Sequence, residues 1–129
     1  MLIAACGGES ADDHLATASQ LEQAGDYAGA LQSLKGALRK DPDNAQTRAL
    51  FSQMYLLLGK PADARTQLDR AIKLGINESA VVLLDIDIAL AEGDAELALA
   101  KIDALKLADR SAKSELRQAQ AHLLLGQSD

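Results

Sequence analysis

The sequence has little of several residue types that build common functional sites. Its 129 residues include one Cys, two Pro, one Phe, two Tyr and no Trp. One Cys excludes an internal disulfide and a metal cluster built from cysteines. Lys and Arg number 13 against 19 Asp and Glu, a net charge of −6, and this argues against nucleic acid as a partner because phosphate binding needs clustered positive charge. The chain also has no apolar run of about 18 residues, which a membrane-spanning helix would need.

Glycines recur along the chain at a fixed interval. Gly25, Gly59 and Gly93 are equally spaced, and Gly126 follows after an interval that is shorter by one. A period of this size is typical of solenoids, and a helix–turn–helix repeat has a length of about 34 residues. Five residues after each of the first three glycines comes a small residue, namely Ala30, Ala64 and Ala98.

The glycines and alanines have different structural roles in the predicted repeat. The glycine follows the first helix of each pair, where a left-handed backbone conformation is common and Gly tolerates it. Asp26 and Asp94 then suit the N-cap of the second helix, and Pro61 suits its first turn in the second repeat. We expect the alanines to face the first helix of the same pair, where a larger side chain would force the two helices apart.

The repeat predicts an all-α solenoid of antiparallel helix pairs. The pattern gives a tether over 1–10, full repeats over 11–44, 45–78 and 79–111, and the first helix of a fourth repeat over 112–129. Within these repeats we predict seven helices, over 11–24, 27–40, 45–58, 61–74, 79–92, 95–107 and 111–125. Since the last helix carries apolar residues and ends in a turn-like segment, we expect the array to continue, or to self-associate, at this open end.

The pattern resembles the tetratricopeptide repeat family over residues 11–129. The most specific stretches are Gly-Asp-Tyr-x-x-Ala at 25–30 and Asp-Pro-x-Asn at 41–44. The resemblance implies a right-handed superhelix whose first helices line a concave face that binds proteins or peptides. The sequence departs from the family where an aromatic residue is usual early in each repeat, since it has His14, Arg48 and Val82 there.

The resemblance assigns ten residues to the concave face. They would form an apolar groove with uncharged and acidic polar groups, suited to a peptide with an apolar face and a basic residue near Glu22 or Asp87. An alternative for individual leucines is that they pack against the adjacent repeat. The ten residues are Leu15, Ser19, Glu22, Gln53, Leu56, Leu83, Asp87, Leu90, Gln120 and Leu123.

Catalytic chemistry is not apparent in the sequence. His14 and His122 lie about three repeats apart, which excludes a shared metal or proton within one chain, and we expect His14 to pack rather than react. Asp85 and Asp87 point to different sides of one predicted helix and do not form a carboxylate pair. The sequence therefore predicts a non-enzymatic protein without a catalytic residue, metal or cofactor.

The N-terminus resembles the end of a bacterial lipoprotein signal. Ile3-Ala4-Ala5-Cys6 fits the lipobox, an aliphatic residue and two small residues before a cysteine that becomes acylated. The segment lacks a basic region and a long apolar region, so we expect a longer precursor. Acylated Cys6 would then be the membrane attachment of an envelope lipoprotein, at the outer membrane because Gly7 rather than Asp follows it. The alternative is a ragged N-terminus in which Cys6 has no role.

With the repeats, this motif gives a second resemblance, to the tetratricopeptide lipoproteins of the PEP-CTERM system. That resemblance implies a scaffold in exosortase-type protein sorting and exopolysaccharide export. Two alternatives remain: a soluble cytosolic adaptor and an accessory repeat domain of a longer enzyme. The resemblance rests on Ala4-Ala5-Cys6-Gly7, Gly25-Asp26-Tyr27, Leu34-Lys35, Ala37-Leu38, Asp41-Pro42, Tyr55-Leu56 and Lys73-Leu74-Gly75.

Overall fold

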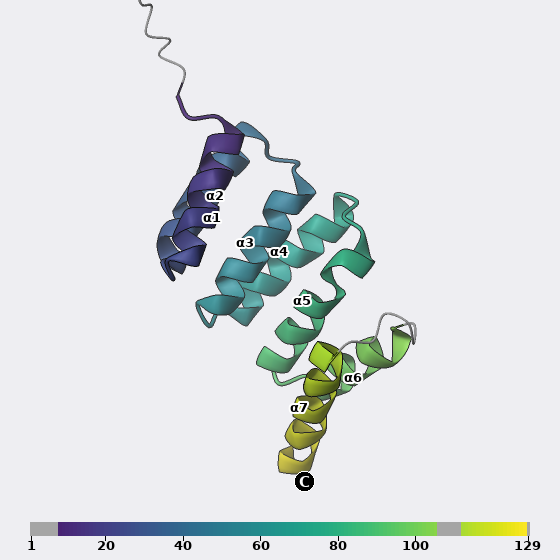
Figure 1. Ribbon diagram of the computed structural model, residues 1–129. Coiled ribbons are helices and arrows are strands. Elements are labelled where there is room, and N and C mark those ends of the chain that lie inside the picture. Colours follow the sequence, from purple (N-terminus) through teal and green to yellow (C-terminus); the bar gives the residue numbers. More distant parts are fainter. Residues whose placement is uncertain (1–7, 106–111, 129) are drawn as a thin grey trace, which may run out of the picture.

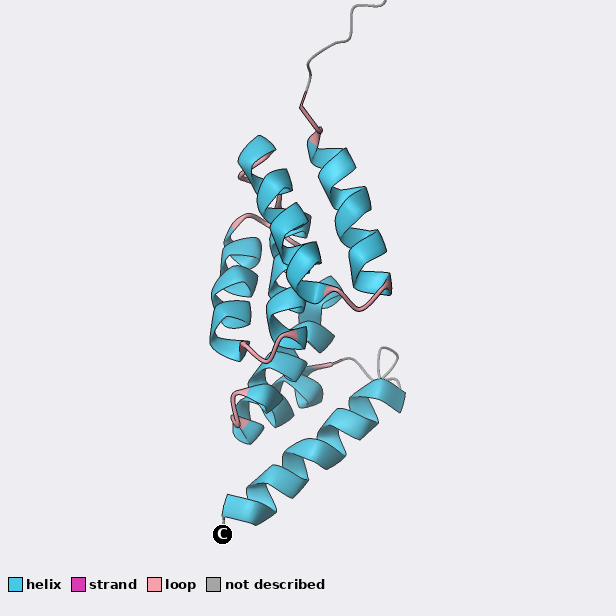
Figure 2. Ribbon diagram, turned by 90° about the vertical axis from the view of Figure 1, so that its left-hand side faces the viewer, coloured by secondary structure: helices cyan, strands magenta, loops and turns pink. Residues whose placement is uncertain are grey.

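The computed structural model describes residues 8–105 and 112–128, and the described part is almost entirely helical (Figures 1 and 2). Consecutive helices pack against one another along the chain, which confirms the predicted all-α solenoid. Cys6 and the rest of the lipobox lie outside the described residues. The helices are α1 (Ala11–Gln23), α2 (Tyr27–Lys40), α3 (Ala45–Leu57), α4 (Pro61–Lys73), α5 (Glu78–Ala91), α6 (Ala95–Ala104) and α7 (Ala112–Ser128).

Left-handed glycines close four of these helices, as the repeat predicts for three of them. Gly25, Gly59 and Gly93 have φ values of 79°, 71° and 79°, and Gly75 has 93° after α4. Each turn has the paired hydrogen bonds of a Schellman motif. At the first, the N–H of Asp26 donates to the carbonyl of Leu21 at 2.8 Å, and the N–H of Gly25 donates to that of Glu22 at 2.9 Å.

Gly126 does not end a helix, and this prediction from the glycine spacing is wrong. Helix α7 runs through Gly126 to Ser128, and Gly126 is not among the positive-φ glycines. The physical reason is that the other four glycines are each followed by a helix that packs back on a preceding one. No described residue after Gly126 forms such a helix, so the backbone stays helical.

Polar caps fix where most helices begin. Ser10 forms a capping box with Asp13 at the start of α1, as expected for a polar residue before a helical run. Asp26 accepts from the N–H of Gly29 at 2.8 Å, and Asp94 accepts from that of Leu97 at 3.0 Å. Lys60 makes no side-chain cap, and Pro61 starts α4 instead, as predicted.

Small side chains allow the paired helices to approach closely. Ala30, Ala64 and Ala98 are at most 1% exposed, which agrees with the predicted role of these repeat positions. In the second pair the hydroxyl of Ser52 on α3 donates to the backbone carbonyl of Ala64 on α4 at 2.8 Å. A side chain as short as serine can reach a backbone carbonyl of the neighbouring helix only where the two helices lie close together.

His14 fills the position where the family usually has an aromatic residue. Its side chain is 18% exposed, and its ring packs on Gly36 of α2, where an added Cβ would lie 2.6 Å from two ring atoms. The missing side chain at Gly36 therefore makes room for the imidazole. This is the packing role expected for His14.

Candidate protein-binding groove

The first helices of successive pairs carry a row of three cavities. The largest, about 660 Å³, lies between α3 and α5. Its walls are mostly small or aliphatic, and its polar side chains are uncharged amides. The residues that define it are Gln46, Ala49, Leu50, Gln53, Ala80 and Leu84.

Two further cavities extend the row towards the ends of the solenoid. The one beside α1 and α3 has about 110 Å³ and includes Leu15, Ser19 and Glu22 in its lining. The one between α5 and α7 has about 420 Å³ and is lined in part by Asp87, Leu90, Gln120 and Leu123. Eight of the ten residues predicted for the concave face therefore line this row, which we call the groove.

Two predicted groove residues lie elsewhere. Leu56 is partly buried and packs against the core cluster that contains Ala64. Leu83 lines a separate cavity with Val82 and Leu105. Leu56 packs against a cluster with residues of both α4 and α5, and Leu83 packs against a cluster with residues of α5, α6 and α7.

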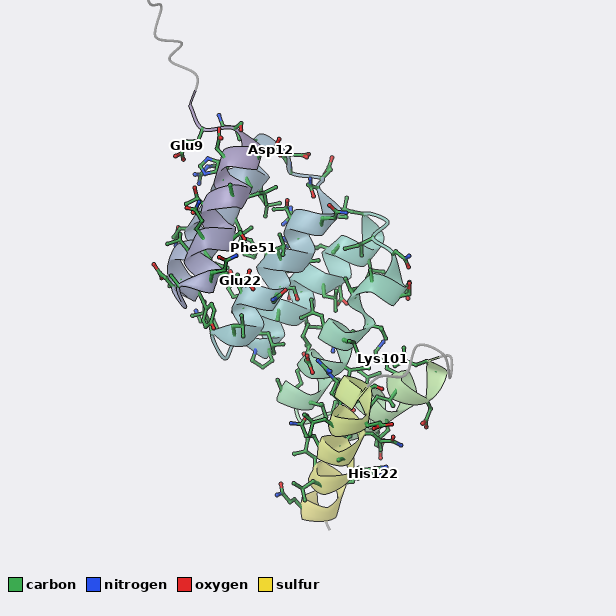
Figure 3. The ribbon with its side chains drawn as sticks, in the orientation of Figure 1. Glu9, Asp12, Glu22, Phe51, Lys101 and His122 are labelled. Carbon is green, nitrogen blue, oxygen red and sulfur yellow. The ribbon has the colours of Figure 1, made fainter. Side chains whose placement is uncertain are left out.

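A hydrogen bond joins the groove walls of the first two repeats. The amide of Gln53 on α3 donates to the carboxylate of Glu22 on α1 at 3.0 Å, and Figure 3 labels Glu22 where α1 faces α3. The resemblance to the tetratricopeptide repeat family predicted that both residues lie in the groove. In the described part of the chain Glu22 has no cation within salt-bridge distance, so its charge remains available to a ligand.

Asp87, the second predicted acidic group, already has a cationic partner. The guanidinium of Arg117 on α7 donates to both oxygens of Asp87, at 2.5 Å each. A bidentate pair of this kind is among the stronger charged contacts in proteins. Asp87 is therefore paired within the chain, and this pair connects α5 to α7.

A second ionic cluster surrounds Asp85, which is 8% exposed. Lys101 of α6 lies 2.7 Å from one of its oxygens, and Arg65 of α4 donates to the other. Arg65 also pairs with Glu92 at 3.2 Å. Burial lowers the pKa of Arg65, but its hydrogen bonds to Asp85 and Glu92 together outweigh burial and leave this pKa raised.

This cluster links three helices and lies apart from the groove cavities, so its role is structural. Sequence reasoning separated Asp85 from Asp87 correctly but did not identify the partners of either. Those partners lie on other helices, far along the chain, and no local pattern marks them. Gln46 of the largest cavity was also missed, although it lies seven positions before Gln53 on the same face of α3.

Other kinds of site are not evident in the described residues. No group of three His, Cys, Asp or Glu residues among them could hold a metal ion. His14 on α1 and His122 on α7 lie at opposite ends of the solenoid (Figures 1 and 3). None of the described helices is long and apolar enough to cross a membrane.

Comparison with known proteins supports the same repeat over the middle of the chain. Residues 21–84 match the family model described as tetratricopeptide repeat. The match starts within α1 and ends within α5, so it contains α2, α3 and α4 complete. No curated protein matches the chain.

Proposed function

We propose that the chain is a non-enzymatic scaffold that holds a protein partner in its groove, because residues 21–84 match the tetratricopeptide repeat model and such repeats generally bind protein or peptide partners. The scaffold acts in the bacterial cell envelope, attached to the membrane through acylated Cys6. It serves a protein-sorting and exopolysaccharide export system of the PEP-CTERM type. Neither a cofactor nor nucleic acid is part of this function.

The largest cavity carries the binding proposal. A volume of about 660 Å³ between α3 and α5 falls within the range of about 300–1,000 Å³ typical of ligand sites. Its small side chains leave room for aliphatic groups of a partner. Gln46 and Gln53 can each donate to and accept from a peptide backbone, which favours an extended segment over a charged terminus.

The carboxylate of Glu22 places a negative charge at one end of the groove. This carboxylate is held in place by Gln53 and lacks a cation in the described residues. A basic side chain of the ligand would complete this site, with the apolar part of the ligand in the cavity between α3 and α5. The ligand class is thus a peptide with an uncharged aliphatic stretch and one Lys or Arg beside it.

Affinity purification from the native host tests the groove. Ala49→Arg places a long cation in the largest cavity, whereas Gln32→Arg adds the same charge to an exposed position on α2 as a matched control. We expect a partner that co-purifies with the wild type and the control but not with Ala49→Arg. Equal recovery of every partner by both variants would contradict binding in the groove.

The envelope part of the proposal is supported by the lipobox-like segment at Cys6 and by the resemblance to the PEP-CTERM lipoproteins. The mass of the N-terminal peptide, measured on protein from the native host, tests it. A peptide that begins at Cys6 with attached acyl chains is the expected result. A peptide that begins at Met1 with a free thiol would favour the soluble adaptor, in which the groove function remains.

A further inference from the structure

The largest groove cavity lies beside an alanine at a repeat position where the neighbouring pairs have leucine. Ala49 of α3 corresponds to Leu15 of α1 and Leu83 of α5. Leu15 packs against a core cluster shared by α1, α2 and α3, and Leu83 packs against one shared by α5, α6 and α7. The side chain of Ala49 ends at its Cβ, and the cavity of about 660 Å³ lies next to it. The cavity beside Leu15 has only about 110 Å³, so the short side chain of Ala49 leaves space that a leucine would partly fill.

The walls of the largest cavity suit a large apolar side chain. The residues that line it carry no charge, and Ala45 and Ala80 are further short side chains among them. Leu50 lines both this cavity and the one beside α1, and at 38% exposed it offers an accessible apolar surface between them. A cavity of about 150 Å³ is large enough for a benzene ring. The space beside Ala49 therefore accommodates a side chain as large as leucine, methionine or phenylalanine.

Gln53 fixes the distance between this space and the charge of Glu22. Its side chain lines the cavity, and its amide donates to the carboxylate of Glu22 at 3.0 Å. Gln53 follows Ala49 by four residues, which is about 6 Å along α3. In an extended peptide, residues two positions apart are separated by about 7 Å and lie on the same side of the chain. A ligand that runs along α3 with one side chain beside Ala49 thus has its next side chain on that face level with Gln53, next to Glu22.

We infer, on the basis of the proposed function, that Ala49 and Glu22 recognise two ligand residues of fixed spacing. A large apolar side chain occupies the cavity, and a Lys or Arg two positions before or after it pairs with Glu22. Ala49 sets the size of the first residue, and Glu22 sets the charge of the second. The residue between them points away from α3, because successive side chains of an extended chain alternate, and it is free to vary.

Selection of random linear peptides displayed on phage tests this spacing, with the 129-residue chain as bait. The wild type is expected to enrich peptides with Leu, Met or Phe two positions from Lys or Arg. Ala49→Leu is expected to enrich a small residue in place of the large one and to keep the Lys or Arg. Glu22→Gln is expected to keep the large apolar residue and to lose the preference for Lys or Arg. Ala100→Leu adds a leucine at an exposed position of α6 and should select the same peptides as the wild type.

Titration with one synthetic peptide selected by the wild type measures each effect. The affinity should fall about tenfold or more in Ala49→Leu and about two- to fivefold in Glu22→Gln, and it should not change in Ala100→Leu. Shortening the large residue of the peptide to Ala should restore part of the affinity for Ala49→Leu. We expect this variant to fold, because Leu15 and Leu83 occupy the same repeat position, and circular dichroism with urea unfolding checks this.

Ala49→Arg separates a failure of this spacing from a failure of groove binding. Some selected peptides are expected to bind the wild type but not Ala49→Arg. If these peptides show no fixed apolar–basic spacing, or keep the large residue with Ala49→Leu as bait, the recognition by Ala49 and Glu22 is overturned and groove binding stands. Equal binding of every selected peptide by the wild type and Ala49→Arg would contradict both, as would a wild type that enriches no peptide.

Discussion

Substitution of Gly36 by Ala tests how α1 and α2 fit together. An added Cβ at Gly36 would lie 2.6 Å from both Cε1 and Nδ1 of His14 and 2.8 Å from its Nε2. These separations are too short for carbon and nitrogen atoms, so the imidazole must leave its site. Since its side chain is 18% exposed and lies 3.4 Å from Glu9, the ring can move towards solvent.

Two opposing effects set the size of the change in the free energy of unfolding. Ala in place of Gly within a helix stabilises by about 1 kcal/mol. The displaced ring costs about 0.5–1.5 kcal/mol in rotamer strain, with the lost packing in addition. We therefore expect Gly36→Ala to be neutral or destabilising by about 1 kcal/mol in the wild type, but stabilising by about 1 kcal/mol in a His14→Ala background.

Urea unfolding of the four proteins in this double-mutant cycle measures the coupling between the two positions. A coupling free energy of about 1–2 kcal/mol is expected, within the range of residues in contact. Gly126→Ala is the matched control, because Gly126 lies in α7 with no atom within 4 Å of an added Cβ. It should stabilise by about 0.5–1 kcal/mol. An equal effect of Gly36→Ala in both backgrounds would refute the proposed fit of His14.

Three further substitutions test other parts of the fold. Ala64→Leu overpacks a site that is 0% exposed and should destabilise by about 1–3 kcal/mol, so an unchanged urea midpoint would contradict the repeat register. Gly59→Ala places a side chain at a φ of 71° and should cost about 1–2 kcal/mol, whereas a neutral result would mean that the turn adapts. Hydrogen bonds from the backbone and hydroxyl of Ser10 hold the pKa of Asp13 below its usual value, so their contribution is present above about pH 3.9 and is lost as pH falls through the lowered pKa. Ser10→Ala removes the hydroxyl but keeps the backbone N–H that contributes most, so it should make unfolding only slightly less sensitive to acid in this range, as measured by urea midpoints in a pH series. An unchanged pH profile would argue against a contribution from the Ser10 hydroxyl.

Most of the fold could be predicted from the sequence because its determinants are local. A glycine at a fixed period ends one helix, and a cap or proline starts the next, so α1 to α6 begin within one residue of their predicted positions. Gly126 shows the limit of this reasoning. Whether a glycine ends a helix depends on what packs after it, and spacing alone does not contain that information.

The groove was partly predictable for a related reason. Glu22 and Gln53 lie on facing sides of successive first helices, so the repeat itself places them together. The ion pair of Asp87 could not be predicted in this way. Its partner Arg117 lies on α7 and is distant in the sequence. Contacts between charged side chains on different helices follow from three-dimensional packing, and a pattern within one repeat does not specify them.

The ionic cluster at Asp85 has a consequence for how the chain avoids misfolding. Repeats that resemble one another can pair out of order, because each apolar face fits several others. At the position equivalent to Asp85 the first two repeats have Thr17 and Phe51, and at the position equivalent to Arg65 the first repeat has Leu31. An out-of-order pairing would bury a charged group against an uncharged one, at a cost of several kcal/mol. Asp85 therefore distinguishes one junction of a repetitive chain from the others during folding.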